Sequence, residues 1–245
     1  MRILLANPNT TQAVTDAIAA TARAVAAPGT EIIPATARFG AAVIGTRSEM
    51  AIAEHACLSL LATESPGCDA VIIGASLDSA LRAAREMLSV PVLGLTESAL
   101  HVACLTGVRF GCLTTNARSA ATLAEMIALY GLSSRCAGIG TLQTTPLDIL
   151  RDPAGMEAAI LAGIANLIVQ GADCVILIGA VMAGMPARVQ ARAEVPVLEG
   201  VACAVPLAET LVRMALPKPR AGSLALPGAR ATIGLDAPLA ARFSG

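Results

Sequence analysis

The chain has 245 residues, a net charge of -1, and is 55% hydrophobic, 14% charged and 2% aromatic. This length allows one large domain or two small ones with sizeable cores, and the composition predicts a well-packed globular protein. The absence of Trp and of a basic surplus argues against a nucleic-acid partner. Apolar runs such as 174–185 are shorter than the ~20 residues that cross a bilayer, so no membrane partner is expected. The N-terminus enters a strand pattern directly, which predicts a cytoplasmic protein.

Cysteine usage predicts thiols in the core and no metal site. No two cysteines form a CxxC pair, and the chain has only two histidines, His55 and His101. Most cysteines fall in apolar helix or strand patterns, where a thiol behaves as a small apolar side chain. The seven are Cys57, Cys68, Cys104, Cys112, Cys136, Cys174 and Cys203.

The chain contains two pairs of similar segments, which indicates two similar halves. Residues 1–11 show an apolar run and a polar turn, and an Ala-rich helical pattern follows them; residues 108–131 show the same order of apolar run, polar turn and helical pattern. Residues 68–95 and 172–200 each show an Asp, an apolar run, a Gly-Ala turn, an Arg-bearing helical pattern and a Val-Pro-Val-Leu run. Arg2 recurs as Arg109, Asp69 as Asp173, and Pro91 as Pro196.

Short buried strands alternate with helices along the whole chain. The first half is predicted to contain strands at 2–6, 30–35, 69–74 and 91–94, with helices ending at Ala27, beginning near Ser48, and covering 79–88 and 97–106. The second half is predicted to contain strands at 108–114, 174–178 and 196–198, one strand before Asp152, and helices at 117–130, 152–172 with Pro153 in its first turn, 186–193 and 201–215.

This alternation predicts an α/β fold with two pseudo-symmetric, Rossmann-like parallel-sheet halves. We assign residues 1–95 and about 200–216 to the first half and 96–199 to the second. Residues 217–245, rich in Pro, Gly and Ala, are expected to form an extended arm on the body or on a neighbouring subunit. The arm and the apolar composition together predict a homo-oligomer.

Ligands of such sheets bind beyond the carboxyl ends of the strands, so we expect a site between the halves. Four turns would form it: 7–11, 74–78, 114–118 and 178–182. Their amides, hydroxyls and helix N-termini suit a small carboxylate or an acidic ring amide. Asn9, Thr10 and Asn116 have helix capping as an equal alternative. Expected substrate contacts are Asn7, Asn9, Thr10, Arg47, Ala75, Thr114, Thr115, Asn116, Gly179 and Ala180.

The order of these motifs resembles the aspartate/glutamate/hydantoin racemase superfamily, most closely its hydantoin and allantoin racemase branch. The resemblance covers about residues 1–215 and is carried by "MRILLANPNTT", "ARFGAAVIGTRSEMAIAEHA", "DAVIIGASLDSALRAARE", "GLTESALHVA", "TTNARSAATLAEMIALYGL" and "ADCVILIGAVM". It implies a cofactor-independent enzyme with two cysteines that remove and return a proton on opposite sides of an acidic carbon.

The two cysteine positions implied by the resemblance are Ala75 and Gly179. Neither residue can accept a proton, so two-thiol racemisation should be absent. Cys112 and Cys174 lie elsewhere on their strands and are not expected to substitute. The "GASLD" turn also resembles that of arylmalonate decarboxylase, which leaves Ser76 as a hydroxyl donor to a carboxylate or enolate oxygen.

Other side chains could supply the chemistry. Glu97 and His101 are four residues apart on one helix face, and Asp78 follows the empty Ala75 position. Each has a structural alternative: a helix cap for Glu97 and Asp78, and a core or inter-domain position for His101. Arg47 and Arg118 are either carboxylate clamps or surface charges.

The sequence therefore predicts a cofactor-independent, metal-free enzyme for a small carboxylate, cyclic ureide or lactam. Without the two thiols, hydrolysis or lyase chemistry is the first expectation. A racemase that uses other bases and a non-catalytic ligand-binding protein are the alternatives.

Overall fold

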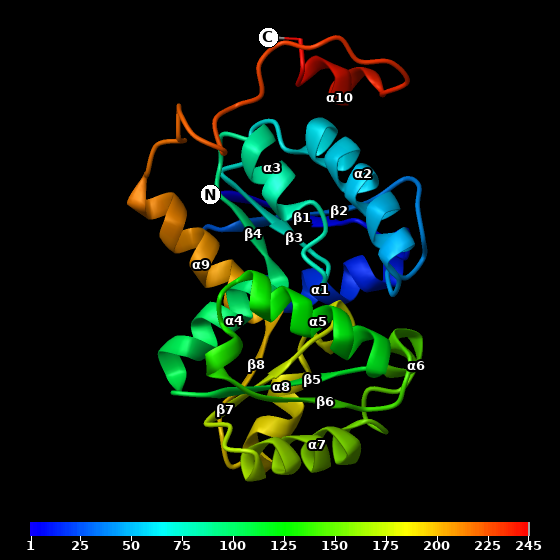
Figure 1. Cartoon of the computed structure of the whole chain (residues 1–245), viewed down its shortest axis with the longest axis vertical. Helices are drawn as coiled ribbons and strands as arrows, with labels where there is room; N and C mark the ends of the chain where they lie inside the picture. The colour runs from blue at the N-terminus through cyan, green and yellow to red at the C-terminus, as the bar shows by residue number, and fades with distance from the viewer. Residues whose placement is uncertain (245) are drawn as a thin grey trace. The chain divides into compact units, whose positions relative to one another are not determined.

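The computed structural model describes residues 1–244 and divides the chain into two compact units. Unit 1 comprises Met1–Gly74, Asp78–Gly94 and Val205–Gly245, and unit 2 comprises Ala75–Leu77 and Leu95–Ala204. Each unit contains one parallel sheet of four strands with helices packed on it (Figure 1). The predicted α/β class with two similar parallel-sheet halves is confirmed. None of the helices in residues 1–244 is long and apolar enough to cross a membrane.

Unit 1 is built on a sheet of strand order β2-β1-β3-β4. Its strands are β1 (Arg2–Asn7), β2 (Glu31–Thr36), β3 (Ala70–Ile73) and β4 (Val92–Gly94). Its helices are α1 (Gln12–Val25), α2 (Arg47–Glu64), α3 (Leu81–Met87) and α10 (Ala237–Ala241). All side chains of β3 are buried, as expected of a central parallel strand that is covered on both faces.

Unit 2 repeats this arrangement in the order β6-β5-β7-β8. Its strands are β5 (Phe110–Thr114), β6 (Cys136–Thr141), β7 (Cys174–Leu177) and β8 (Val197–Glu199). Its helices are α4 (Leu95–Thr106), α5 (Ala117–Leu129), α6 (Pro146–Arg151), α7 (Glu157–Val169) and α8 (Met185–Val189), with 3-10 turns at Ser133–Arg135, Ala180–Met182 and Gln190–Arg192. Helix α9 (Gly200–Met214) follows β8.

The sheet of unit 2 has a different neighbour on each face. Phe110 and Cys112 pack in one core cluster with Ala99 of α4 and Leu123 of α5. Gly111 faces the other way, and a Cβ atom added to it would lie 2.9 Å from the Cβ of Leu167 in α7. The period-two alternation of β5 therefore places α4 and α7 on opposite faces, as Figure 1 shows.

The repeat in the sequence is reproduced in the hydrogen bonds at the start of each sheet. In unit 1 the backbone N–H of Arg2 donates to Asp69 Oδ2 at 2.7 Å, and the N–H of Asp69 donates to the Arg2 carbonyl at 2.8 Å. In unit 2 Arg109 and Asp173 make the same two bonds, both at 2.8 Å. These Arg–Asp pairs lie at the amino ends of the strands, away from the predicted ligand edge, so their role is structural.

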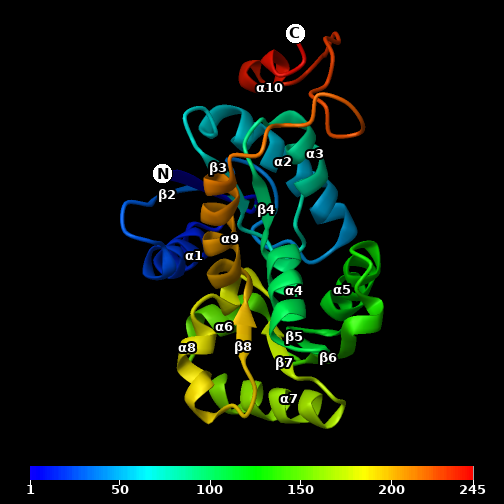
Figure 2. The ribbon, with the colours of Figure 1, turned by 90° about the vertical axis from the view of Figure 1, so that its left-hand side faces the viewer.

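The arm after α9 packs on unit 1 and ends in α10, which contacts α2 (Figure 2). Leu239 of α10 is 2% exposed, and the Arg242 guanidinium donates to the Ala62 carbonyl at 3.2 Å and to Ser65 Oγ at 3.3 Å. The arm therefore has a short docked helix that its Pro- and Gly-rich composition did not predict.

Two local predictions are wrong, and one helix cap was not predicted. Pro153 lies in a turn, because helix α7 begins only at Glu157 and the short helix α6 precedes it. Thr145 caps α6 by accepting from the Asp148 N–H, a local signal that was not recognised in the sequence. Neither Asn9 nor Thr10 caps α1, since the helix starts after Thr11 and has no side-chain cap.

Candidate functional site

The carboxyl ends of β5 and β8 bring two polar side chains to one edge of the unit 2 sheet. Because the strands are parallel, Thr114 ends β5 and Glu199 ends β8 on the same side of the sheet. Leu177 of β7 lies between them in register, opposite Leu113 and Glu199. Thr114 is 2% exposed, and within residues 1–244 its hydroxyl has no hydrogen-bond partner. This hydroxyl can therefore donate to a ligand oxygen.

The segment Ala75–Leu77 belongs to unit 2 although it follows β3 of unit 1. The Thr96 hydroxyl of α4 donates to the Ser76 carbonyl at 2.6 Å and so fixes the segment to the start of that helix. Ala75 is 5% exposed, while Ser76 is half-buried, and its hydroxyl has no protein partner in the described part of the chain. Thr114 and Ser76 thus both offer a free hydroxyl in unit 2.

Gly179 occupies the second position at which the resemblance placed a cysteine, and its backbone explains the glycine. Its φ of +146° and ψ of 133° lie in a region that L-residues rarely adopt. A Cβ atom there would have Met182 Cγ as its nearest neighbour, at 3.4 Å. Space is therefore available, but the backbone would have to change before a thiol stood here. Ala180, half-buried, begins the 3-10 turn that follows.

Glu199 is the site residue that sequence reasoning missed. Its side chain is 2% exposed, and its two oxygens accept from the backbone N–H groups of Val201 at 2.7 Å and Ala202 at 2.6 Å. Burial raises the pKa of Glu199 from 4.5 to about 7, against the opposing effect of these two hydrogen bonds. The available signal was a glutamate directly after the apolar run "VPVL" at the carboxyl end of a predicted strand.

The turn after Ser76 is strained. Asp78 and Ala80 have positive φ angles of 47° and 63°, and the buried hydroxyl of Ser79 between them has no partner in residues 1–244. Strained backbone and an orphaned hydroxyl are common where a ligand binds. Asp78 does not occupy the N-cap position of α3, because Ala80 holds that position and the helix starts at Leu81.

Within unit 1, the Asp78 carboxyl depends on a glycine of β4. A Cβ atom on Gly94 would lie 2.4 Å from the Asp78 Cγ, so only glycine leaves room for the carboxyl group. Asp78 itself is 6% exposed. Its position is therefore specified by strand β4 and by the turn.

The turn after β1 uses its amides internally. The Asn7 Nδ2 atom donates to Asn9 Oδ1 and to Thr15 Oγ1, both at 3.0 Å, and Asn9 Oδ1 accepts from the Thr11 N–H at 2.9 Å. Asn7 is fully buried, and Thr10 is half-buried with its N–H bonded to the Ala41 carbonyl at 3.1 Å. Asn7 and Asn9 thus shape the turn.

The turn after β5 behaves as its capping alternative predicted. Asn116 is the N-cap of α5, and its Oδ1 accepts from the Ser119 N–H at 3.1 Å. Thr115 is 3% exposed, and its hydroxyl contacts Asn116 Nδ2 at 3.1 Å. Thr114 is therefore the threonine of this turn with a free hydroxyl.

The proposed Glu97–His101 pair is not joined through its carboxylate. His101 Nδ1 bonds to the Glu97 backbone carbonyl at 2.8 Å, and the His101 side chain is exposed beside Tyr130. Its core alternative is therefore wrong. Glu97 is half-buried in the first turn of α4. Arg47 and Arg118 are both exposed, the former at the start of α2.

Within residues 1–244, no group of three or more His, Cys, Asp or Glu side chains could hold a metal ion. Cys112 lies inside β5 and Cys174 at the first position of β7, so neither thiol is at the carboxyl edge. Proton transfer at this edge would fall to carboxylates and hydroxyls.

Comparison with known proteins agrees with this architecture. The family model described as Asp/Glu/Hydantoin racemase matches residues 3–208. A hydantoin racemase from Pseudomonas sp. (strain NS671) is 32% identical over 214 residues, covering 86% of each chain.

Two solved structures are similar over nearly the whole chain. The allantoin racemase from Klebsiella pneumoniae has a TM-score of 0.92 and 33% identity and covers 98% of both chains. The allantoin racemase from Pseudomonas fluorescens has a TM-score of 0.91 and 34% identity, covering 96% of this chain and 100% of that one. The chain belongs to the Asp/Glu/hydantoin racemase family.

Proposed function

We propose that this protein is a cofactor-independent enzyme that opens or cleaves a small cyclic ureide, with hydantoin and allantoin rings as the first candidates. The similarity to a hydantoin racemase and to an allantoin racemase supports this substrate class. The observation that carries the reaction class is the strand-end chemistry: Ala75 and Gly179 offer no thiol, whereas Ser76 and Thr114 keep free hydroxyls.

In the proposed hydrolysis the two hydroxyls donate to the substrate carbonyl oxygen, which becomes negatively charged when water attacks the carbonyl carbon. Glu199 accepts the proton of the attacking water and returns it to the departing ring nitrogen. A carboxyl group with a pKa of about 7 suits both steps at neutral pH. In the overall reaction one water molecule is added across one C–N bond of the ring.

The test is proton NMR in deuterated water with 5-substituted hydantoins, allantoin, lactams and substituted malonates. A ring-opened product from a hydantoin or allantoin supports the proposal. Loss of the α-proton signal without a new species would replace it by racemase chemistry with other bases. Ligand line-broadening without reaction would favour a non-catalytic binding protein.

Variants assign the roles. We expect Ser76→Ala and Thr114→Val each to lower kcat about 10²-fold or more, since each removes one oxyanion donor. Thr122→Val is the matched control, because the Thr122 hydroxyl donates to the Arg118 carbonyl within α5. Full activity of both Ser76→Ala and Thr114→Val would remove the hydroxyls from the mechanism.

A further inference from the structure

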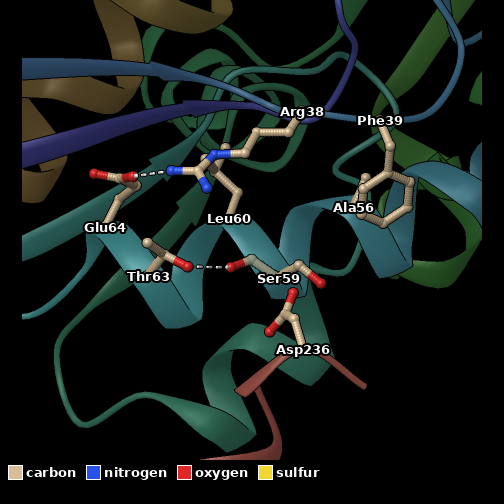
Figure 3. Close-up of a pocket in the computed structure, with 8 residues that line it drawn as sticks. All are labelled: Arg38, Phe39, Ala56, Ser59, Leu60, Thr63, Glu64 and Asp236. Atoms are coloured by element: carbon tan, nitrogen blue, oxygen red, sulfur yellow. Dashed lines mark hydrogen bonds and ion pairs between the residues drawn. The ribbon is translucent and has the colours of Figure 1, made fainter. Parts of the chain in front are cut away.

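A pocket lies in unit 1, among residues that the proposed reaction does not use. It is a surface pocket with a cavity volume of about 70 Å³ between α2, the loop after β2 and the start of α10 (Figure 3). This volume is smaller than that of a typical drug-sized ligand site, so the pocket has room for only a few non-hydrogen atoms. Its lining residues are Arg38, Phe39, Ala56, Ser59, Leu60, Thr63, Glu64 and Asp236.

Ser59 brings an unsatisfied hydroxyl to this pocket. The residue is 8% exposed, and its Oγ atom has no partner within residues 1–244. The nearby Thr63 hydroxyl donates instead to the Ser59 carbonyl at 3.1 Å. A serine inside a helix usually returns its hydroxyl to a carbonyl of the preceding turn, and Ser59 does not. Leaving a buried hydroxyl without a hydrogen bond is unfavourable, and a ligand that bonds to it would remove this cost.

Asp236 supplies a carboxylate beside this hydroxyl. Its Oδ1 atom caps α10 by accepting from the Leu239 N–H at 2.8 Å, and its Oδ2 atom has no partner in the described residues. Figure 3 shows the Asp236 side chain directed from the arm toward Ser59 on α2. Two unused oxygen acceptors from two different segments therefore face the same space.

The remaining charges of the pocket compensate each other. Arg38 and Glu64 form an ion pair at 3.7 Å, on the side of the pocket away from Asp236 (Figure 3). One arginine against two carboxylates, Glu64 and Asp236, leaves a net charge of -1 on the lining. This balance favours a cation over an anion.

The rest of the wall is apolar. Phe39, Ala56 and Leu60 line the pocket with carbon atoms, and the Phe39 ring is further held by an edge contact with His55, at 5.1 Å between centroids. A ligand that fits has a positively charged donor group at one end and a short hydrocarbon portion at the other.

We propose that this pocket binds a small primary amine, whose ammonium group donates to Asp236 Oδ2 and Ser59 Oγ while its hydrocarbon portion packs on Phe39 and Leu60. Binding joins the arm to α2, because the two acceptors come from α10 and α2. The proposal is independent of the reaction proposed for unit 2.

The pocket is also connected to the turn after β1. Arg38 and Phe39 open a glycine-rich loop, residues 38–46, that continues to Ala41 and Ala42. The Ala41 carbonyl accepts from the Thr10 N–H at 3.1 Å, and the Ala42 carbonyl accepts from the Thr11 hydroxyl at 2.7 Å. A ligand that prefers one arrangement of this loop would therefore also act on the β1 turn.

The experiment compares propylammonium chloride, sodium propionate and propanol as probes of the full chain by saturation-transfer NMR and thermal unfolding. We expect saturable binding of propylammonium with a dissociation constant between about 0.1 and 10 mM, within the limit for so small a ligand. Binding should raise the melting temperature with increasing concentration. Propionate and propanol should bind at least about tenfold more weakly.

The Asp236→Asn variant tests the proposed contact with the ammonium group without removing the helix cap. Asn caps helices as well as Asp does, so α10 keeps its cap while the pocket loses its charge. We expect at least a tenfold loss of propylammonium affinity. Asp152→Asn is the matched control, because Asp152 likewise accepts the N–H three residues on, from Gly155 at 2.9 Å, but lies outside the pocket.

Ser59→Ala provides a second, independent variant. It should weaken propylammonium binding about fivefold while leaving the ligand-free protein equally or more stable, because the orphan hydroxyl is gone. Absence of saturable propylammonium binding by the unmodified protein, equal binding of propionate, or full affinity in Asp236→Asn would each overturn the proposal. None of these results depends on turnover of a ureide.

Discussion

The buried Glu199 should make unit 2 less stable as the pH rises. Its folded-state pKa, about 7, is above the 4.5 of the exposed group because burial disfavours the carboxylate. The unfolded chain therefore releases this proton at lower pH than the folded chain does. The stability associated with the protonated form is complete below about pH 4.5 and is lost as the pH rises through about 7.

The size of this loss follows from the pKa difference. A shift of about 2.5 units corresponds to about 3 kcal/mol, at about 1.4 kcal/mol per unit. About 2.5 kcal/mol of it falls between pH 5 and pH 8. Other groups titrate in this range too, so the useful quantity is the difference between two proteins that share them.

The assay is urea unfolding of the unmodified protein and of Glu199→Gln at several pH values from 5 to 8. Glutamine does not ionise, so the stability of the unmodified protein relative to the variant should fall by about 2.5 kcal/mol across this range. Glu209→Gln is the control, since Glu209 is a buried glutamate of unit 1 that accepts from the Ala27 N–H and the Thr30 hydroxyl. The Glu209→Gln variant keeps Glu199, so its free energy of unfolding should still fall with pH by the amount that Glu199 causes. If the free energy of unfolding changed with pH in the same way for the unmodified protein and for Glu199→Gln, the reasoning would be refuted.

Three further predictions concern single residues. Gly179→Ala should lower the free energy of unfolding by about 1–3 kcal/mol because of its positive φ, measured as the urea midpoint; an unchanged midpoint would contradict the strain. Asn7→Ala should cost about 2–3 kcal/mol, since it removes several buried hydrogen bonds, whereas the helix cap lost in Asn116→Ala should cost about 1 kcal/mol; equal losses would show that the β1 turn is not held by its amides. Cys136, whose pKa is lowered to about 7 chiefly by a hydrogen bond with a neighbouring thiol, should react with iodoacetamide at neutral pH before Cys57, whose pKa burial raises to about 12; mass spectrometry of the modified peptides distinguishes the two orders.

The two-half architecture was predictable because it depends on local pattern and on repetition. Short apolar runs between helical patterns specify parallel strands. The recurrence of Arg2 as Arg109, and of Asp69 as Asp173, predicted equivalent positions in the two halves. In both units the backbone N–H of the arginine donates to the aspartate carboxylate, so the same pair of residues begins each sheet. The family resemblance rested on the same motifs and needed no coordinates.

Predictions that depend on a single hydrogen bond were less successful. Asn9, Thr10 and Asn116 had equal claims as helix caps, yet only Asn116 caps a helix. The side-chain amides of Asn7 and Asn9 bond to one another instead, and the buried Thr15 hydroxyl of α1 holds Asn7 in place by accepting a second hydrogen bond from it. Residue type alone cannot decide whether a side-chain amide caps a helix or bonds to a neighbouring side chain, because either bond satisfies the amide.

The sequence by itself determined the fold class, the strand-end turns and the absence of thiols at Ala75 and Gly179. Tertiary structure decided which polar groups at those turns are free and which are used internally. It identified Glu199, because a pKa near 7 arises from burial and cannot be read from residue type. It also created the unit 1 pocket, whose two acceptors, Ser59 and Asp236, are 177 positions apart in the sequence. Residue spacing encodes local periodicity, whereas burial and long-range pairing exist only once the chain has folded.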